Sequence, residues 1–235
     1  YARRRAQLLW EFLDTTEEGE ELGELAMLRR ARERSNIDNV LYYAARLWHR
    51  YHPDAELKQQ RTAEEEERGI ITIFPVSGID VGAQIIELAR LRPEDLDPRL
   101  HDLAHTLAGS SAIILNIDYP LGFAAYHILR EITESLDQLR GVYVLGKAAT
   151  LNGAIGDVLV SDVVFDEHSK NVYTFPNAFS YTSVAPFLER GSVLDNQKAV
   201  TVKGTFLQNR AYLDFFYRES YTVVEMEAGP YLSCK

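Results

Sequence analysis

The sequence has a single cysteine, Cys234, and no apolar run long enough to cross a membrane. One cysteine excludes an internal disulfide framework and is typical of a reducing compartment, so we expect a cytoplasmic protein. A membrane-spanning helix needs about 20 consecutive apolar residues, so no contact with a membrane is expected. Basic residues are few as well, since 25 Lys and Arg stand against 35 Asp and Glu, a net charge of −10. Nucleic-acid binding requires clustered Lys and Arg, so no nucleic-acid partner is expected.

Metal-binding patterns are also missing from the sequence. His101 and His105 are one helical turn apart, but nothing nearby completes a zinc ligand set. We therefore expect no metal and no cofactor.

The chain is long enough, at 235 residues of which 46% are hydrophobic, to bury the core of one α/β domain. The helical periodicity of residues 1–68 predicts an N-terminal helical extension. An α/β domain is predicted to follow it over residues 69–235. The apolar positions fall into three stripes: Leu8, Leu9, Phe12 and Leu13; Leu22, Leu25, Ala26 and Leu28; and Val40, Leu41, Ala44, Leu47, Trp48 and Tyr51.

Beyond residue 69, apolar runs of strand length alternate with segments of helical period. Such alternation predicts an α/β fold with one mixed central sheet sandwiched by helices. The predicted strands cover residues 70–76, 112–117, 142–145, 157–166 and 199–203, and the predicted helices cover residues 81–91, 123–136 and 208–219.

Residues 222–229 read Thr-Val-Val-Glu-Met-Glu-Ala-Gly, which predicts a buried strand followed by the start of a helix. α/β sheets bind ligands at such corners. A carboxylate here could accept hydrogen bonds from the 2′- and 3′-hydroxyls of a ribose while a methionine packs on the sugar, which makes Glu225, Met226 and Glu227 candidate ribose-binding residues. The alternative is that both glutamates are ordinary first-turn acids, favoured by the helix dipole.

Other motifs come before this corner in a definite order. They are Asn-Ile-Asp-Tyr-Pro-Leu-Gly at 116–122, Gly-Lys-Ala-Ala-Thr-Leu-Asn-Gly at 146–153, Ile-Gly-Asp-Val-Leu-Val at 155–160 and Lys-Gly-Thr-Phe at 203–206. Together with Val-Glu-Met-Glu-Ala at 224–228, this order resembles the nucleoside phosphorylase and nucleosidase family over residues 70–235.

The resemblance implies a nucleoside or nucleotide ligand, cleavage of its N-glycosidic bond and a homo-oligomeric assembly. It places Phe206 against the base. It implies an anion or water site, with phosphate as a possible second ligand, whose residues would be Ser77, Gly78, Gly146, Lys147 and Thr150.

The sequence departs from the family at the positions that hold phosphate. Gly82 and Val144 stand where phosphorylases have arginines, and Lys147 stands where they have a serine. The strand that carries the family's catalytic acid is expected after Lys235, so the C-terminus is either incomplete or has lost that acid, and the catalytic residues stay unassigned. Three functions remain open: a nucleosidase or phosphorylase, a catalytically inactive nucleoside-binding module, and a scaffold dominated by its helical extension.

Overall fold

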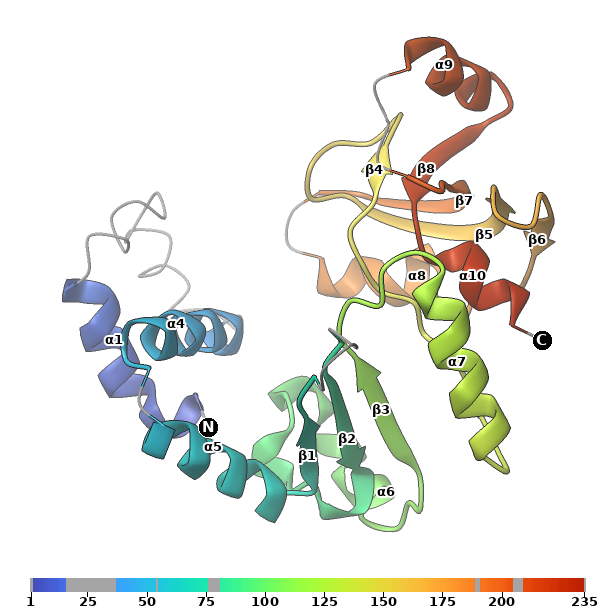
Figure 1. The fold of residues 1–235 in the computed structure, drawn as a ribbon. Helices are drawn as coiled ribbons and strands as arrows, with labels where there is room; N and C mark the ends of the chain where they lie inside the picture. Colours follow the sequence, from blue (N-terminus) through green and yellow to red (C-terminus); the bar gives the residue numbers. More distant parts are fainter. Residues whose placement is uncertain are drawn as a thin grey trace. The chain divides into compact units, whose positions relative to one another are not determined.

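The computed structural model describes residues 2–15, 37–53, 55–75, 81–188, 191–204 and 209–234. The chain forms two compact units, Tyr1–Asp118 and Tyr119–Lys235 (Figure 1). The boundary predicted between residues 68 and 69 falls inside the first unit. The predicted stripe from Leu22 to Leu28 lies outside the described residues.

The first unit begins with helices, as predicted: the amphipathic α1 (Ala6–Thr15) and α4 (Ile37–Tyr51), and the polar α5 (Ala55–Glu67). The helices α1 and α4 pack against each other because each carries an apolar stripe at helical spacing. Their common core consists of Leu9, Trp10, Leu13, Leu41, Ala44, Ala45 and Leu47.

The sheet of the first unit has three antiparallel strands in the order β1-β2-β3. These strands are β1 (Ile70–Ile73), β2 (Ala83–Glu87) and β3 (Ile113–Ile117). A short helix, α6 (Ala104–Ala108), precedes β3. The helix predicted over residues 81–91 is wrong, because β2 occupies its centre. Ile85 and Ile86 are β-branched and pair with isoleucines of β1, so cross-strand packing decides the conformation.

The second unit contains a five-stranded mixed sheet in the order β4-β8-β7-β5-β6. Its strands are β4 (Ala149–Thr150), β5 (Val158–Asp166), β6 (Val172–Thr174), β7 (Val193–Thr201) and β8 (Tyr221–Glu225). Its helices are α7 (Ala124–Ser135), α8 (Tyr181–Val184), α9 (Arg210–Arg218) and α10 (Ala228–Ser233). The three inner strands β5, β7 and β8 are parallel, and the outer strands are antiparallel to them.

Apolar side chains cover both faces of this sheet, since successive residues of a strand point to opposite faces. On one face, Val200 and Val224 pack with Phe216 of α9. On the other face, Ala199 and Val223 pack near Leu232 of α10. Figure 1 shows α9 and α10 on opposite sides of the sheet.

The predictions for the second unit are partly confirmed. The strand expected over 157–166, the helix expected over 208–219 and the strand-to-helix corner after Glu225 are present. The strand expected over 142–145 is wrong, because residues 141–148 form no strand and their side chains are exposed. The single central sheet is also wrong: the described residues form two sheets, and β3 belongs to the first of them. The fold is mixed α/β.

None of the helices among the described residues combines the length and the apolar character needed to cross a membrane.

Candidate functional site at the carboxyl edge of the parallel strands

The three parallel strands of the second unit end in polar residues that form one lateral row. In the register of the sheet, Asp166 pairs with Thr201, and Thr201 pairs with Glu225. Paired residues of neighbouring strands point to the same face, so the three side chains are neighbours on the face that α10 covers. The carboxyl ends of parallel strands are the usual ligand site of open α/β sheets.

Glu225 uses both carboxylate oxygens within the protein. Its Oε1 accepts a hydrogen bond from the Thr201 hydroxyl, and its Oε2 accepts from the backbone nitrogens of Glu227 at 2.7 Å and Ala228 at 2.6 Å. Burial raises the pKa of Glu225, although these hydrogen bonds favour the charged form. Glu225 therefore satisfies the free N–H groups that begin α10.

The closeness of α10 to β5 depends on Gly229. The backbone nitrogen of Gly229 donates to the Thr201 hydroxyl at 2.8 Å. A Cβ atom at position 229 would lie 2.6 Å from both Cβ and Cγ of Asp166, which is shorter than any normal contact. Only glycine allows the helix to approach the strand this closely.

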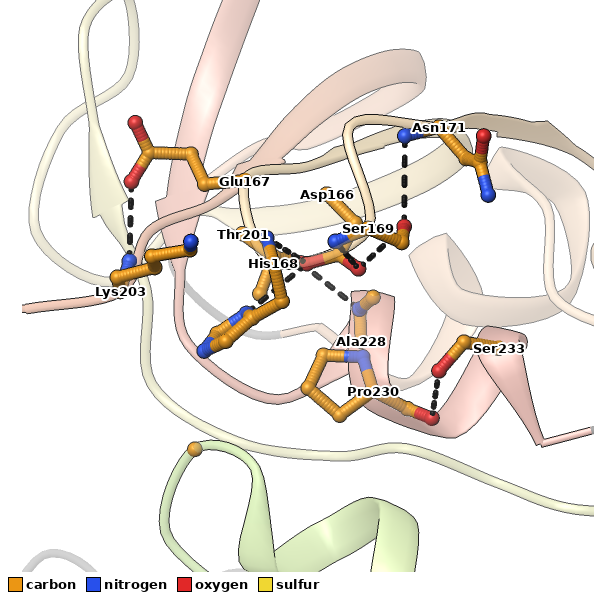
Figure 2. Close-up of polar contacts among 12 residues, drawn as sticks. Asp166, Glu167, His168, Ser169, Asn171, Thr201, Lys203, Ala228, Pro230 and Ser233 are labelled. Atoms are coloured by element: carbon orange, nitrogen blue, oxygen red, sulfur yellow. Dashed lines mark hydrogen bonds and ion pairs between the residues drawn. The ribbon is translucent and has the colours of Figure 1, made fainter.

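Asp166 is 1% exposed and organises the turn that follows β5 (Figure 2). Its Oδ1 accepts from the backbone nitrogen and Nδ1 of His168, both at 3.0 Å. Its Oδ2 accepts from the backbone nitrogen and the hydroxyl of Ser169, at 3.0 and 2.7 Å. Burial acts to raise the pKa of Asp166, but the hydrogen bonds from Ser169 and His168 outweigh it, so this pKa lies below its ordinary value.

Glu227 is held by a turn at the start of the second unit. In this turn Tyr119 and Gly122 have positive φ angles of 49° and 56°. The backbone nitrogen of Gly122 donates to Oε1 of Glu227 at 3.0 Å. No described residue donates to the other oxygen, and Glu227 is partly exposed. Glu227 thus presents an oriented carboxylate with free acceptor capacity.

The same turn positions the imidazole of His168. Phe123, which follows Gly122, stacks on this ring with a centroid separation of 5.6 Å and an interplanar angle of 27°. Tyr126 stacks on Phe123 in turn, at 5.1 Å. Consecutive residues of one turn therefore contact Glu227 and His168, which brings these two side chains to the same end of the sheet.

The remaining predicted site residues lie in different environments. Met226 packs against the core on the α9 side, whereas Glu225 faces α10. Gly146 and Lys147 are exposed in the irregular segment before β4, and no atom lies within 4 Å of where a Gly146 Cβ would be. The Thr150 hydroxyl accepts from the backbone nitrogen of Gly153 at 2.9 Å and so closes a local turn. Ser77, Gly78 and Phe206 lie outside the described residues.

β4 runs antiparallel to β8, so the chain enters β4 at the edge where β8 ends. Lys147 is therefore at the same edge of the sheet as Glu225 and Glu227. The structure thus brings Lys147 to the edge that carries Glu225 and Glu227, although it shows no anion-binding turn at Gly146.

Sequence reasoning did not select Asp166, Thr201 and His168. The signal for Asp166 was present, because an aspartate at the end of a strand with a serine three residues later is typical of a side-chain-capped turn. The signal for Thr201 was absent, since a threonine inside a β-branched run is ordinary strand sequence.

In the part of the chain that the structure describes, no three His, Cys, Asp or Glu side chains are grouped closely enough to hold a metal ion. The features above define a mixed α/β protein whose candidate ligand site lies at the carboxyl ends of parallel strands. The chain belongs to a family of unknown function (DUF6909), whose model matches residues 1–234. Comparison with curated proteins and with solved structures finds no match.

Proposed function

We propose that the carboxyl edge of the five-stranded sheet binds a ribonucleoside-type ligand and hydrolyses its N-glycosidic bond. One observation carries the proposal: Glu227 stands at the end of the parallel strands with one oxygen held by Gly122 and the other open. A carboxylate in this state can accept hydrogen bonds from vicinal ribose hydroxyls. The order of motifs that resembles nucleoside phosphorylases and nucleosidases supports this class of ligand.

Glu225 and Glu227 have different hydrogen-bond partners and therefore different proposed roles. Glu225 caps α10 and fixes the backbone of the corner, whereas Glu227 is free to contact the ligand. In the proposed reaction, positive charge develops on the sugar as the bond to the base breaks, and an oriented carboxylate beside the sugar stabilises that charge. The roles of Met226 as a backing for the sugar and of Phe206 as a partner of the base stay predictions.

Hydrolysis is favoured over phosphorolysis by the charges near the site. A phosphate dianion requires several positive groups or a cradle of backbone N–H groups. Lys147 is exposed in an irregular segment, and Val144 carries no charge. Water has no such requirement.

The second candidate is a binding module without turnover, and the same irregular segment supports it. No ordered turn surrounds Gly146, so the anion site of an active phosphorylase is not formed there. We further propose a cytoplasmic location, on the basis of the single cysteine, and a homo-oligomer.

Calorimetric titration with a purine ribonucleoside and its 2′,3′-dideoxy analogue tests binding. Glu227→Gln should weaken ribonucleoside binding at least about tenfold, because each hydrogen bond to a charged group contributes about 1.5–3 kcal/mol. The dideoxy analogue should bind weakly to both proteins. Glu131→Gln on the exposed side of α7 changes the charge equally and should bind like the wild type.

Chromatography of the sugar product tests the reaction. The protein is incubated with a panel of nucleosides and nucleotides, with and without inorganic phosphate. Formation of ribose in both conditions would support hydrolysis. Formation of ribose 1-phosphate only in the presence of phosphate would show instead that the protein is a phosphorylase. No product, together with normal ribonucleoside binding, would favour the binding module, and equal affinities of wild type and Glu227→Gln would refute the ribose site.

A further inference from the structure

Asp166 and His168 form an oriented acid–base pair at the carboxyl end of β5. The Nδ1 atom of His168 lies 3.0 Å from Oδ1 of Asp166, which is buried and already accepts three other hydrogen bonds. A carboxylate in this position keeps a proton on Nδ1 and leaves Nε2 as the nitrogen that exchanges protons. Figure 2 shows His168 and Ser169 converging on Asp166 from the turn after β5.

The second nitrogen of His168 is not used by the protein. No described residue forms a hydrogen bond with Nε2, although the side chain is only 19% exposed. Stacking on Phe123 and the bond to Asp166 together fix the plane of the ring. An imidazole held on two sides and open at one nitrogen is suited to proton transfer.

The position of His168 relative to the proposed sugar site follows from the turn that contacts both. Gly122 holds Glu227, and the next residue, Phe123, stacks on His168. A ribose bound by Glu227 would therefore have the imidazole at the same end of the sheet.

We infer that His168 is the general acid that protonates the departing base, and that Asp166 is the positioning residue that orients it. This inference rests on the proposed function. As the bond between C1′ and the base nitrogen breaks, its electron pair goes to the base, and the proton on Nε2 passes to the base. Water then adds to C1′, and the proton that it loses returns to Nε2, so the products are ribose and the neutral base.

Other titratable groups surround His168 and contribute to any pH profile. On the elements around it these are Glu167, Lys203, Glu225, Glu227, Tyr231 and His127. Glu225 is fully hydrogen-bonded, and the Glu167 carboxylate accepts from Tyr212 and from the backbone of Lys203. His127 is the other imidazole that contacts Phe123, at 5.1 Å, and it is exposed, which makes it the matched control.

The test compares wild type, His168→Asn and His127→Asn on two substrates. Asparagine at 168 can still donate to Asp166 but has no proton to give to the base. The first substrate is a purine ribonucleoside, and the second is a nitrophenyl riboside, whose leaving group departs as a stable anion and needs no proton. His168→Asn should slow the single turnover of the nucleoside by about 10²–10⁴-fold, the usual contribution of a general acid. It should cleave the nitrophenyl riboside nearly as fast as wild type, and His127→Asn should be unaffected on both.

The pH profile provides a second readout. The wild-type rate on the nucleoside should fall as pH rises, because only a protonated imidazole can give a proton to the base, and His168→Asn should lack this fall. Asp166→Asn should slow cleavage of the nucleoside more than cleavage of the nitrophenyl riboside, because the imidazole has lost the carboxylate that orients it.

Equal nucleoside rates for wild type and His168→Asn, or equal slowing of His168→Asn on both substrates, would overturn the inference. So would a wild type that turns over neither substrate. Calorimetric binding of the ribonucleoside to the same proteins separates these outcomes from failure of the proposed function, because His168→Asn should bind it normally and Glu227→Gln should not.

Discussion

The hydroxyl of Thr201 accepts a hydrogen bond from the backbone nitrogen of Gly229 at 2.8 Å, across 28 residues of sequence. The same hydroxyl donates to Glu225, so it connects the end of β7 with the end of β8 and with the first turn of α10. Thr201 is completely buried, which means that no water can replace either bond.

Replacing this hydroxyl should therefore be costly. Thr201→Val keeps the shape but leaves a buried carboxylate oxygen and a buried N–H group without their partner, at about 1–3 kcal/mol for each unsatisfied group. Urea unfolding measures the loss. Thr174→Val on the exposed edge strand β6 is the control and should change stability by less than about 0.5 kcal/mol. Equal stability of the two variants would contradict the arrangement at the corner.

Gly229→Ala should destabilise the second unit through overlap with Asp166. Alanine normally favours a helix over glycine by about 1 kcal/mol, but overpacking costs about 1–3 kcal/mol and should dominate here. Gly146→Ala is the matched control, because its Cβ would meet no atom within 4 Å. Thermal melting of both variants decides the matter, and a stabilised Gly229→Ala would count against the close approach of α10 to β5.

The carboxyl groups of Asp166 and Glu225 should give stability a distinctive pH dependence. Asp166 has a pKa below the ordinary 3.8, so its stabilising contribution is complete above that pH and is lost as pH falls through the folded-state pKa. Glu225 has a pKa above the ordinary 4.5, so acidification through the interval between 4.5 and the raised value stabilises the fold. The two effects therefore have opposite sign and occupy different pH ranges.

Urea unfolding measured at a series of pH values should separate the contribution of Asp166 from that of Glu225. Asp166→Asn should remove the fall in stability below pH 3.8, and Glu225→Gln should remove the gain on acidification towards pH 4.5. Asp214→Asn on the exposed side of α9 should keep both features. A wild-type stability that rises steadily from acid to neutral pH would disagree with the environment of Glu225.

We also expect the protein to self-associate. The apolar stripes of α1 and α4 are largely buried against each other, but Ile113 and Ile114 on neighbouring positions of β3 are 55% and 48% exposed. Exposed apolar residues on both faces of an edge strand favour association with another chain. Light scattering should give a mass above that of one chain, and Ile114→Lys should lower it. A monomer at micromolar concentration would refute this expectation.

Local patterns in the sequence were sufficient where one segment determines its own structure. The helical stripes of α1 and α4, the strand β5 and the corner after β8 all follow from periodicity and from β-branched runs. Residues 81–91 and 142–145 show the limit of this approach. Isoleucine pairs next to glycine and alanine are compatible with helix or strand, and a short apolar run becomes a strand only when a neighbour pairs with it.

The two glutamates of the corner illustrate the same limit for the site. In the sequence Glu225 and Glu227 look alike, two residues apart in one motif. Their partners distinguish them, and those partners are Thr201, 24 residues away, and Gly122, 105 residues away. No local pattern indicates which carboxylate forms hydrogen bonds within the protein and which can still accept hydrogen bonds from a ligand.

The bond between Gly122 and Glu227 makes occupancy of the site observable at a backbone amide 105 residues away in the sequence. The amide of Gly122 donates to Glu227, so exchange of its hydrogen requires this contact to open. A ligand that binds Glu227 stabilises the closed form and slows that exchange, by the same factor by which it lowers the population of the open form. Hydrogen exchange at Gly122 thus reports on any compound that occupies the corner, whatever its chemistry and whether or not it is turned over.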